Sequence, residues 1–337
     1  MRPIGIYALA ESNVSHVLVT RHDKIGDFVL ALPLCWAIKQ ASPETRLTVL
    51  VSRVNEAFAR QIPFINDVLL YEPGWRGFLQ TLDRLKQARV LASISCFIDT
   101  RLGCLLWLAG IHMRIGPATK FAQIFFNGRV VQRRSNVEKP EWSYNLELGK
   151  QLFPDLPQAF RRPLLVPPRA VLNDTSVAEI LRACRERKVV VFHSGFGGSS
   201  DGNLALVDYI RLARIASEIP GVHVVFTFGP DDLAAYGQVR ANLDFEADLV
   251  QSLPGLWAFC AFLQACALFV STSTGPMHLA GAVNTRTLSF FGASAFASSR
   301  RWEPLNARDR QSNFMLSGTP SAEVFDEIVL AMKGALK

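Results

Sequence analysis

The sequence lacks several patterns that mark particular classes of protein. Its six cysteines include no Cys-x-x-Cys pair, and no histidine stands at metal-ligand spacing, so neither a disulfide framework nor a zinc finger is expected. Several cysteines lie in apolar stretches, as buried free thiols do. No stretch reaches the roughly 18 uncharged apolar residues that span a bilayer, and the apolar run near the start is shorter than a secretory core. These absences predict a cytoplasmic protein that touches the inner face of the membrane at most peripherally.

Paired acids and basic runs are missing as well. No Asp-x-Asp and no tight acidic pair is present to hold a metal on a diphosphate, so helix N-termini and side chains would have to neutralise one. The 36 Lys and Arg residues against 29 Asp and Glu give a net charge of +7, which favours an anionic partner or serves solubility. Because no run of five basic residues and no basic–aromatic cluster occurs, we expect no nucleic-acid partner. The missing acidic pair predicts that no metal is bound, and we expect no cofactor.

Length and patterning predict an α/β protein of two domains. The chain has 337 residues, of which 49% are hydrophobic, enough for two cores. Short apolar runs alternate with helix-period stretches, which indicates parallel sheets covered on both faces. The expected strands are 17–20, 47–51, 68–70, 94–98, 189–193, 222–228, 268–271 and 287–291. We therefore predict two doubly wound, Rossmann-like domains that face a central cleft.

A proline-rich stretch between 153 and 168 predicts the domain boundary. Its five prolines cannot continue a helix or a central strand. We expect domains at 1–160 and 161–318, followed by a last helix within 319–337 that packs back towards the N-terminal domain. Thr319 would cap this helix, and Pro320 would take its first position.

The first candidate site follows the first predicted strand, from Arg21 to Phe28. Gly26 permits a close backbone approach, and Asp27 stands at a helix start, where the dipole favours a carboxylate. Asp27 is either a capping residue or an unpaired carboxylate at the rim of a cleft, where it would take a proton from an acceptor hydroxyl.

Two further candidate sites follow strands of the second half. The segment 192–203 is rich in glycine and small hydroxyls, which makes either a phosphate-binding nest or a flexible loop; no Gly-Lys-Ser/Thr ends it. The segment 271–282 has four hydroxyl residues before Pro276, a residue suited to a first helical turn. His278 lies on that turn, where it either donates to a phosphate or is a satisfied structural histidine.

Taken together, these segments resemble glycosyltransferase family 9, the lipopolysaccharide heptosyltransferases of GT-B fold. The likeness runs over most of the chain, and its order and spacing are specific. It is carried by the segments Arg21–Asp27 with Leu32-Pro33, Ile98–Arg101, Arg114–Gly116, His193–Gly195, Phe228–Asp232 and Ser273–His278.

The resemblance implies a metal-independent, inverting transfer from a nucleotide-sugar donor, first ADP-heptose, to a lipid-linked oligosaccharide acceptor. It implies that domain 1–160 binds the acceptor, domain 161–318 binds the donor, and Asp27 is the catalytic base. The acceptor-binding residues expected are Arg101, Arg114 and Lys120. The donor-binding residues expected are Ser194, Gly195, Gly197, Gly198, Ser199, Ser200, Asp232, Ser273, Thr274, Gly275, Pro276 and His278.

The chain departs from the family pattern at two positions. Asp201-Gly202-Asn203 replaces a segment that often carries a basic residue, and Ser273 replaces an aspartate that contacts the sugar. Sugar hydroxyls are discriminated by individual hydrogen bonds. The sequence therefore leaves open a different donor sugar, a homologue that binds a nucleotide sugar without catalysis, and a nucleotide-sugar epimerase.

The segment from Arg101 to Lys120 carries one more hypothesis. Residues 104–111 are almost wholly apolar and are flanked by basic residues, which Arg129, Arg133 and Arg134 extend. An ordinary buried helix is expected for Leu105, Leu106 and Leu108, while the basic flanks would meet phosphates or carboxylates of a lipid-linked acceptor.

Overall fold

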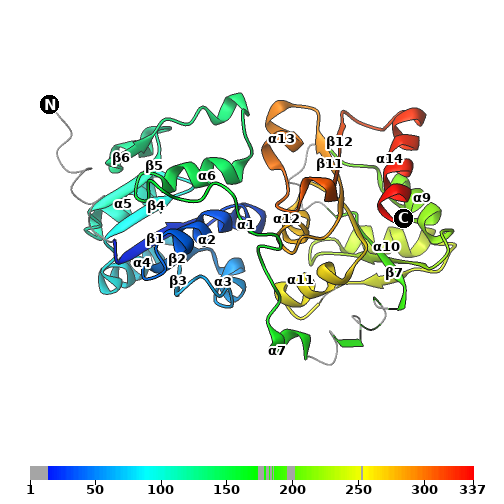
Figure 1. Ribbon diagram of the computed structural model, residues 1–337, viewed down its shortest axis with the longest axis horizontal. Coiled ribbons are helices and arrows are strands. Elements are labelled where there is room, and N and C mark those ends of the chain that lie inside the picture. Colours follow the sequence, from blue (N-terminus) through cyan, green and yellow to red (C-terminus); the bar gives the residue numbers. More distant parts are fainter. Residues whose placement is uncertain are drawn as a thin grey trace. The chain divides into compact units, whose positions relative to one another are not determined.

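The chain folds into two compact units. The computed structural model describes residues 14–173, 178–179, 182, 184, 186–195, 202–251 and 253–337. Unit 1 ends at Phe160 and unit 2 begins at Arg161, within the proline-rich stretch of the sequence. Each unit contains one parallel six-stranded sheet with helices packed against it (Figure 1).

Unit 1 has the strand order β3-β2-β1-β4-β5-β6, with every neighbouring pair parallel. Its elements are β1 (His16–Thr20), α1 (Ile25–Val29), α2 (Leu32–Ala41), β2 (Arg46–Val51), α3 (Arg53–Ala59), β3 (Asp67–Leu70), α4 (Gly74–Ala88), β4 (Ala92–Ser95), α5 (Thr100–Leu108), β5 (Met113–Pro117), the 3₁₀ helix η1 (Phe121–Phe125), β6 (Gly128–Val130), the 3₁₀ helix η2 (Arg134–Asn136) and α6 (Glu141–Gly149).

Unit 2 repeats this order as β9-β8-β7-β10-β11-β12, again all parallel. Its elements are α7 (Arg169–Leu172), β7 (Lys188–His193), α9 (Leu206–Ser217), β8 (Val222–Thr227), α10 (Leu233–Asn242), β9 (Asp248–Val250), α11 (Leu256–Ala265), β10 (Leu268–Thr272), α12 (Gly275–Ala282), β11 (Thr287–Gly292), η3 (Ala295–Ala297), α13 (Ser299–Trp302), η4 (Arg308–Arg310), β12 (Gln311–Leu316) and α14 (Ala322–Ala335).

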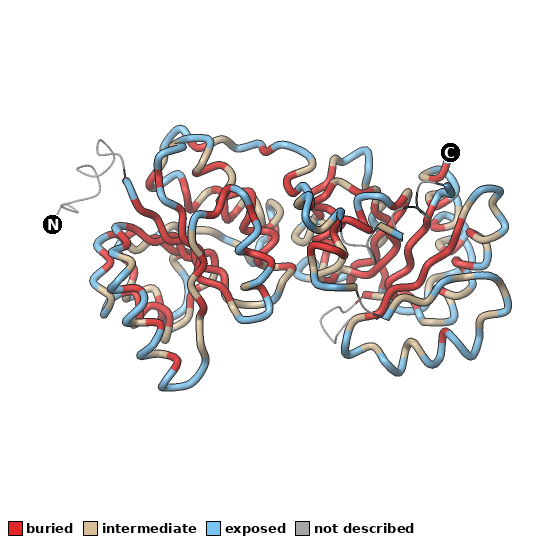
Figure 2. The backbone as a smooth tube through the Cα atoms, turned by 90° about the horizontal axis from the view of Figure 1, so that it is seen from below, coloured by how far each residue is buried: buried red, intermediate tan, exposed pale blue. Residues whose placement is uncertain are grey.

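The central strands are buried along their whole length, which is why they read as continuous apolar runs. All residues of β1, β10 and β11 are buried, and buried backbone runs through the middle of each unit in Figure 2. In unit 1, α4 and α5 pack on one face of the sheet through residues such as Leu85 and Leu105. In unit 2, α9 and α14 cover one face, while α11 and α12 contact the other. The predicted α/β, doubly wound fold class is confirmed.

The last helix differs from its prediction. Its N-cap is Ser321, whose hydroxyl accepts the Val324 amide hydrogen at 3.4 Å, rather than Thr319. Its residues Phe325, Ile328 and Met332 belong to the hydrophobic core of unit 2, while packing towards the N-terminal domain stays a prediction. The apolar side of the helix thus helps to bury one face of the unit 2 sheet.

Candidate active site

The two sheets share one topology, and that topology selects where ligands bind. In each sheet the strand order reverses between the first and fourth strands of the unit, β1 and β4 in unit 1, β7 and β10 in unit 2. Open parallel sheets bind ligands beyond the carboxyl ends of the strands at such a switch point. The segment with Asp27 follows β1, His193–Gly195 follows β7, and Ser273–His278 follows β10. Three sequence motifs therefore stand at the two switch points.

Asp27 lies in the first turn of α1, as predicted, but it is not an unpaired carboxylate. Its Oδ1 accepts a hydrogen bond from a terminal nitrogen of the Arg21 guanidinium. About a fifth of the Asp27 side chain is exposed, against 5% for Arg21. This pair could not be predicted from the sequence pattern, because Arg21 and Asp27 are six residues apart and meet only through the turn between β1 and α1.

Arg21 is the centre of a buried charge cluster. Besides Asp27, it donates to Asp23 through Nε at 2.9 Å, and its Nη1 lies 3.6 Å from an oxygen of Glu141. Glu141 in turn accepts from Arg134 at 2.5 Å. Burial alone would lower the pKa of Arg21, but the carboxylates of Asp27, Asp23 and Glu141 outweigh it and raise that pKa above its ordinary value. The guanidinium is therefore permanently charged and fixed in place.

A second polar pair flanks this cluster. His22 Nε2 lies 3.1 Å from Asp99 Oδ2, and the His22 ring lies 4.1 Å from that of Tyr71. Asp99 also caps α5 by accepting the Leu102 amide hydrogen at 2.7 Å. Burial raises the pKa of Asp99, but the hydrogen bonds from His22 and Leu102 prevail and lower it. Asp99 thus remains an ionised cap at neutral pH.

The three residues expected to bind the acceptor have different surroundings. Arg101 donates to the carbonyls of Glu72 and Gly74 at 2.9 and 2.6 Å, and Arg114 donates through Nε to the carbonyl of Phe125 at 2.7 Å. Both guanidinium groups therefore brace the backbone of unit 1. Lys120 is exposed, with its Nζ 4.3 Å from the centre of the Phe97 ring. Acceptor binding by these residues stays a prediction.

At the end of β7, two predicted donor residues, Gly195 and Asp232, lie close to His193. Asp232 Oδ2 is 4.0 Å from His193 Nε2 and accepts the Gly229 amide hydrogen at 2.8 Å. Gly195 passes so near this carboxylate that a Cβ there would lie 1.9 Å from Oδ2. Burial lowers the pKa of His193 to about 4, although Asp232 acts to raise it. The ends of β7 and β8 thus present one carboxylate beside a neutral imidazole.

The turn before α12 brings hydroxyls and a helix N-terminus together. Thr274 is the N-cap and Pro276 occupies the first turn, while Ser273 donates its amide hydrogen to Phe290 O at 2.9 Å. Ser273, Gly275 and Pro276 are half-buried, so this turn is open to solvent in part. Burial lowers the pKa of His278 to about 3, so its imidazole is neutral and has one N–H to donate. Gly197, Gly198, Ser199 and Ser200 lie outside the described residues.

Several buried polar atoms around these turns have no hydrogen-bond partner in the part of the chain that the structure describes. They are Ser194 Oγ, Ser271 Oγ, Ser289 Oγ and His278 Nδ1. Ser271 stands beside both His193 and Ser289 in the register of the sheet, so a polar row crosses three strands. Unsatisfied buried polar groups call for water or a ligand. The signal missed in the sequence was a serine inside each of two apolar strands.

The described ranges contain neither a metal-binding cluster of side chains nor a helix able to span a membrane. No group of three or more His, Cys, Asp or Glu side chains there is placed to hold a metal ion. Between residues 14 and 337, leaving out the gaps given above, no helix combines the length and the apolar character needed to cross a membrane.

Comparison with known proteins adds the family. Residues 101–326 match the description of glycosyltransferase family 9 (heptosyltransferase). The chain is similar to a Haemophilus influenzae protein provisionally named a glycosyltransferase, with 34% identity over 306 residues and 88% of each chain covered. It is also similar to lipooligosaccharide heptosyltransferase 2 of Campylobacter jejuni, with 21% identity over 290 residues and 84% of each chain covered.

Solved structures agree with this match at the level of the fold. A family 9 glycosyl transferase from Veillonella parvula superposes with a TM-score of 0.82 at 14% identity, covering 97% of this chain and 98% of that one. The E. coli ADP-heptose lipopolysaccharide heptosyltransferase II superposes with a TM-score of 0.78 at 17% identity, covering 95% and 98%. Both likenesses show the GT-B fold. With more than half its length matched and a relative above 30% identity, the chain belongs to glycosyltransferase family 9 and is a glycosyltransferase.

Proposed function

We propose that this enzyme transfers a sugar from a nucleoside diphosphate donor to a lipopolysaccharide core or a related surface glycolipid, with inversion and without a metal. ADP-heptose is the first candidate donor, because the names of two similar proteins refer to heptosyl transfer and one of them to ADP-heptose. The observation that carries the proposal is the contrast between the switch points: a carboxylate at that of unit 1, and hydroxyls with a helix N-terminus at that of unit 2.

Asp27 is the proposed general base. Arg21 holds one of its carboxylate oxygens, and the described residues offer no hydrogen bond to the other, which is left to accept the proton of an acceptor hydroxyl. As that hydroxyl oxygen bonds to the anomeric carbon, the bond from this carbon to the diphosphate breaks on the opposite face. The proton passes to Asp27 and the electron pair leaves with the nucleoside diphosphate.

Groups of unit 2 would stabilise the departing diphosphate. The N-terminus of α12 directs amide hydrogens outward, and the macrodipole favours an anion there. The unsatisfied hydroxyl of Ser194 and the neutral imidazole of His278 supply further donors. Asp232, next to Gly195, is the candidate partner for the ribose hydroxyls, since a carboxylate accepts two such hydrogen bonds.

Ser273 is the residue that we expect to influence which donor sugar the enzyme accepts. This half-buried residue stands where family members often have an aspartate that contacts the sugar. A hydroxyl and a carboxylate discriminate sugar hydroxyls differently. We therefore propose a screen of ADP-, UDP- and GDP-sugars by thermal shift, since a ligand that binds only the folded state raises the melting temperature.

The Asp27→Asn variant tests the base. It keeps the size of the side chain but cannot accept the proton, so the transfer rate should fall roughly 10²–10⁴-fold while donor binding persists. The rate is measured as nucleoside diphosphate released in the presence of a panel of lipopolysaccharide-core acceptors. Asp23→Asn is the matched control, because it also removes a carboxylate charge beside Arg21 yet leaves Asp27 intact.

Three outcomes would replace the proposal. Full transfer by Asp27→Asn would assign the base to another group. Donor binding by the unmodified enzyme with no transfer to any acceptor would indicate a homologue that binds without catalysis. Turnover of the donor in the absence of any acceptor would indicate an epimerase.

A further inference from the structure

The net positive charge of the chain is concentrated in one segment. Residues 100–137 contain six Lys and Arg residues and not one Asp or Glu. Six of the seven net positive charges of the whole protein therefore come from 38 of its 337 residues. The rest of the chain is almost neutral. A bias of this size needs an explanation in terms of a local partner rather than of general solubility.

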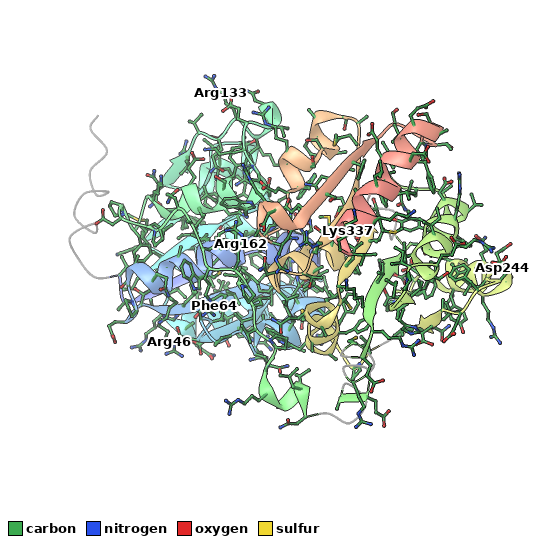
Figure 3. All side chains as sticks on the ribbon, turned by 45° about the vertical axis from the view of Figure 1, so that its right-hand side comes forward. Arg46, Phe64, Arg133, Arg162, Asp244 and Lys337 are labelled. Atoms are coloured by element: carbon green, nitrogen blue, oxygen red, sulfur yellow. The ribbon has the colours of Figure 1, made fainter. Side chains whose placement is uncertain are left out.

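Half of these cations are engaged inside unit 1. Arg101 and Arg114 hold backbone carbonyls, and Arg134 is paired with Glu141. The other three, Lys120, Arg129 and Arg133, are exposed, although Arg129 also donates through Nε to the carbonyl of Phe126 at 2.9 Å. The Arg133 side chain points away from the ribbon in Figure 3. Among the described residues these three side chains form no ion pair with an acid, so their charges are available to an anionic surface.

The same segment exposes large apolar side chains. Trp107 and Leu108, at the end of α5, are 56% and 42% exposed, and Phe121 and Ile124, on η1, are 72% and 52% exposed. The expectation that Leu108 is buried like Leu105 and Leu106 is therefore wrong. The helix presents its last turn outward, beyond the sheet that buries its earlier residues.

These apolar residues lie on two elements, α5 and η1, that pack tightly together. The rings of Trp107 and Phe125 are 6.5 Å apart, and a Cβ added at Gly103 would lie 2.9 Å from Phe125. Ala122 and Phe126 are buried on the inner side of η1. We name the α5–η1 surface as Trp107, Leu108, Phe121, Ile124, Lys120 and Arg129.

We infer that the α5–η1 surface docks on an anionic phospholipid bilayer. Exposed aromatic and aliphatic side chains beside cations are the composition of interfacial membrane contacts, in which apolar groups enter the acyl boundary and Lys or Arg meets headgroup phosphates. Single-stranded nucleic acid would use stacked aromatic faces and would gain little from Leu108 and Ile124. The inference stands on unit 1 alone and does not depend on the proposed transfer reaction.

Sedimentation of the full-length protein with vesicles tests the inference. Binding to vesicles of phosphatidylcholine with phosphatidylglycerol is expected, with weaker binding at high salt and little binding to phosphatidylcholine alone. The double variants Phe121→Ser with Ile124→Ser, and Lys120→Glu with Arg129→Glu, should each lower the partition constant roughly tenfold or more. A control double variant, Leu330→Ser with Lys333→Glu, changes an exposed apolar and an exposed basic residue of α14 and should bind as the unmodified protein does.

Tryptophan fluorescence identifies the face that enters the bilayer. Brominated lipids should quench the unmodified protein and the Trp75→Phe variant, but quench the Trp107→Phe variant much less. Trp75 is the matched control because it is 72% exposed on α4. Equal vesicle binding by the surface variants, quenching lost with Trp75 instead of Trp107, or binding to single-stranded nucleic acid but not to vesicles would each overturn the inference.

Discussion

At the scale of single residues, the cluster around Arg21 explains how the Asp27 carboxylate is held in one position while it stays partly exposed to solvent. Arg21 is almost fully buried, and a buried charge is tolerated only when it is paired and hydrogen-bonded. Its partners Asp23 and Asp27 lie on the β1–α1 turn, while Glu141 comes from α6. The Asp27 side chain is about a fifth exposed at the start of α1, which suits a base that must reach a substrate.

The buried histidines of unit 2 make its stability depend on pH. Burial lowers the pKa of His278 to about 3 in the folded state, against about 6.5 in an unfolded chain. The unfolded state therefore binds a proton below pH 6.5 that the folded state does not bind until about pH 3, so the stabilising contribution is lost as the pH falls. Between pH 7 and pH 5 this histidine alone should lower the free energy of unfolding by about 2 kcal/mol.

The His278→Gln variant measures that contribution, since glutamine does not titrate. Urea unfolding at pH 7 and pH 5 should show a loss of stability smaller by about 2 kcal/mol in the variant than in the unmodified protein. His112→Gln, at an exposed position, is the control and should leave the pH dependence unchanged. Equal losses of stability between pH 7 and pH 5 in His278→Gln and in the unmodified protein would mean that the fold does not lower the pKa of His278.

The sequence predicted the place of Asp27 on a first helical turn but not its neighbours. A carboxylate after a glycine at a helix start is a local pattern that can be recognised within the eight residues from Arg21 to Phe28. The pairing of Glu141 with Arg134 and Arg21 joins segments up to 120 residues apart, and single-sequence patterns carry no information on such contacts. The backbone-bracing bonds of Arg101 and Arg114 escaped prediction for the same reason.

At the scale of elements, the predicted strands were those buried on both faces. Val17–Thr20 and Leu268–Ser271 fall inside β1 and β10, whose residues are all buried. The strands missed were β5, β6, β9 and β12, and three of these are short or half-exposed. β4 ends at Ser95, three residues before its predicted end, because the chain turns there to form the cap of α5. β6, β9 and β12 are edge strands, which pair with another strand along one edge only. Such strands are less buried, so they carry no continuous apolar run.

The contact between the β7 and β8 turns yields a prediction for Gly195→Ala. A Cβ at this position would lie 1.9 Å from the Asp232 carboxylate, so the two turns must separate. Such overpacking costs about 1–3 kcal/mol of stability, and the rise in melting temperature with ADP should disappear. Gly237→Ala is the matched control: no atom lies within 4 Å of its added Cβ inside α10, and alanine should stabilise that helix by about 0.5–1 kcal/mol. Unchanged ADP binding by Gly195→Ala would remove Gly195 and Asp232 from the donor site.

At the scale of the whole molecule, each unit is a complete doubly wound domain with its own core. The same strand order recurs in both, and the boundary lies between Phe160 and Arg161. Six of the seven net positive charges belong to unit 1, and the unsatisfied hydroxyls near His278 belong to unit 2. The two halves thus differ in surface chemistry although they share a fold. This division predicts that a nucleotide bound in the absence of an acceptor slows amide exchange in unit 2 alone.

Hydrogen exchange on the full-length protein can separate the two units. With saturating ADP, amides in 190–195, 228–234 and 272–282 should exchange more slowly, because binding stabilises the folded turns by RT ln(1 + [L]/Kd), about 2.7 kcal/mol at 100 times Kd. Peptides from 14–160 should be unchanged, and the Gly195→Ala variant should show no slowing at any peptide. Mass spectrometry of peptic fragments resolves these segments. Protection confined to 14–160 would place the nucleotide in unit 1 and reverse the assignment of donor and acceptor to the two switch points.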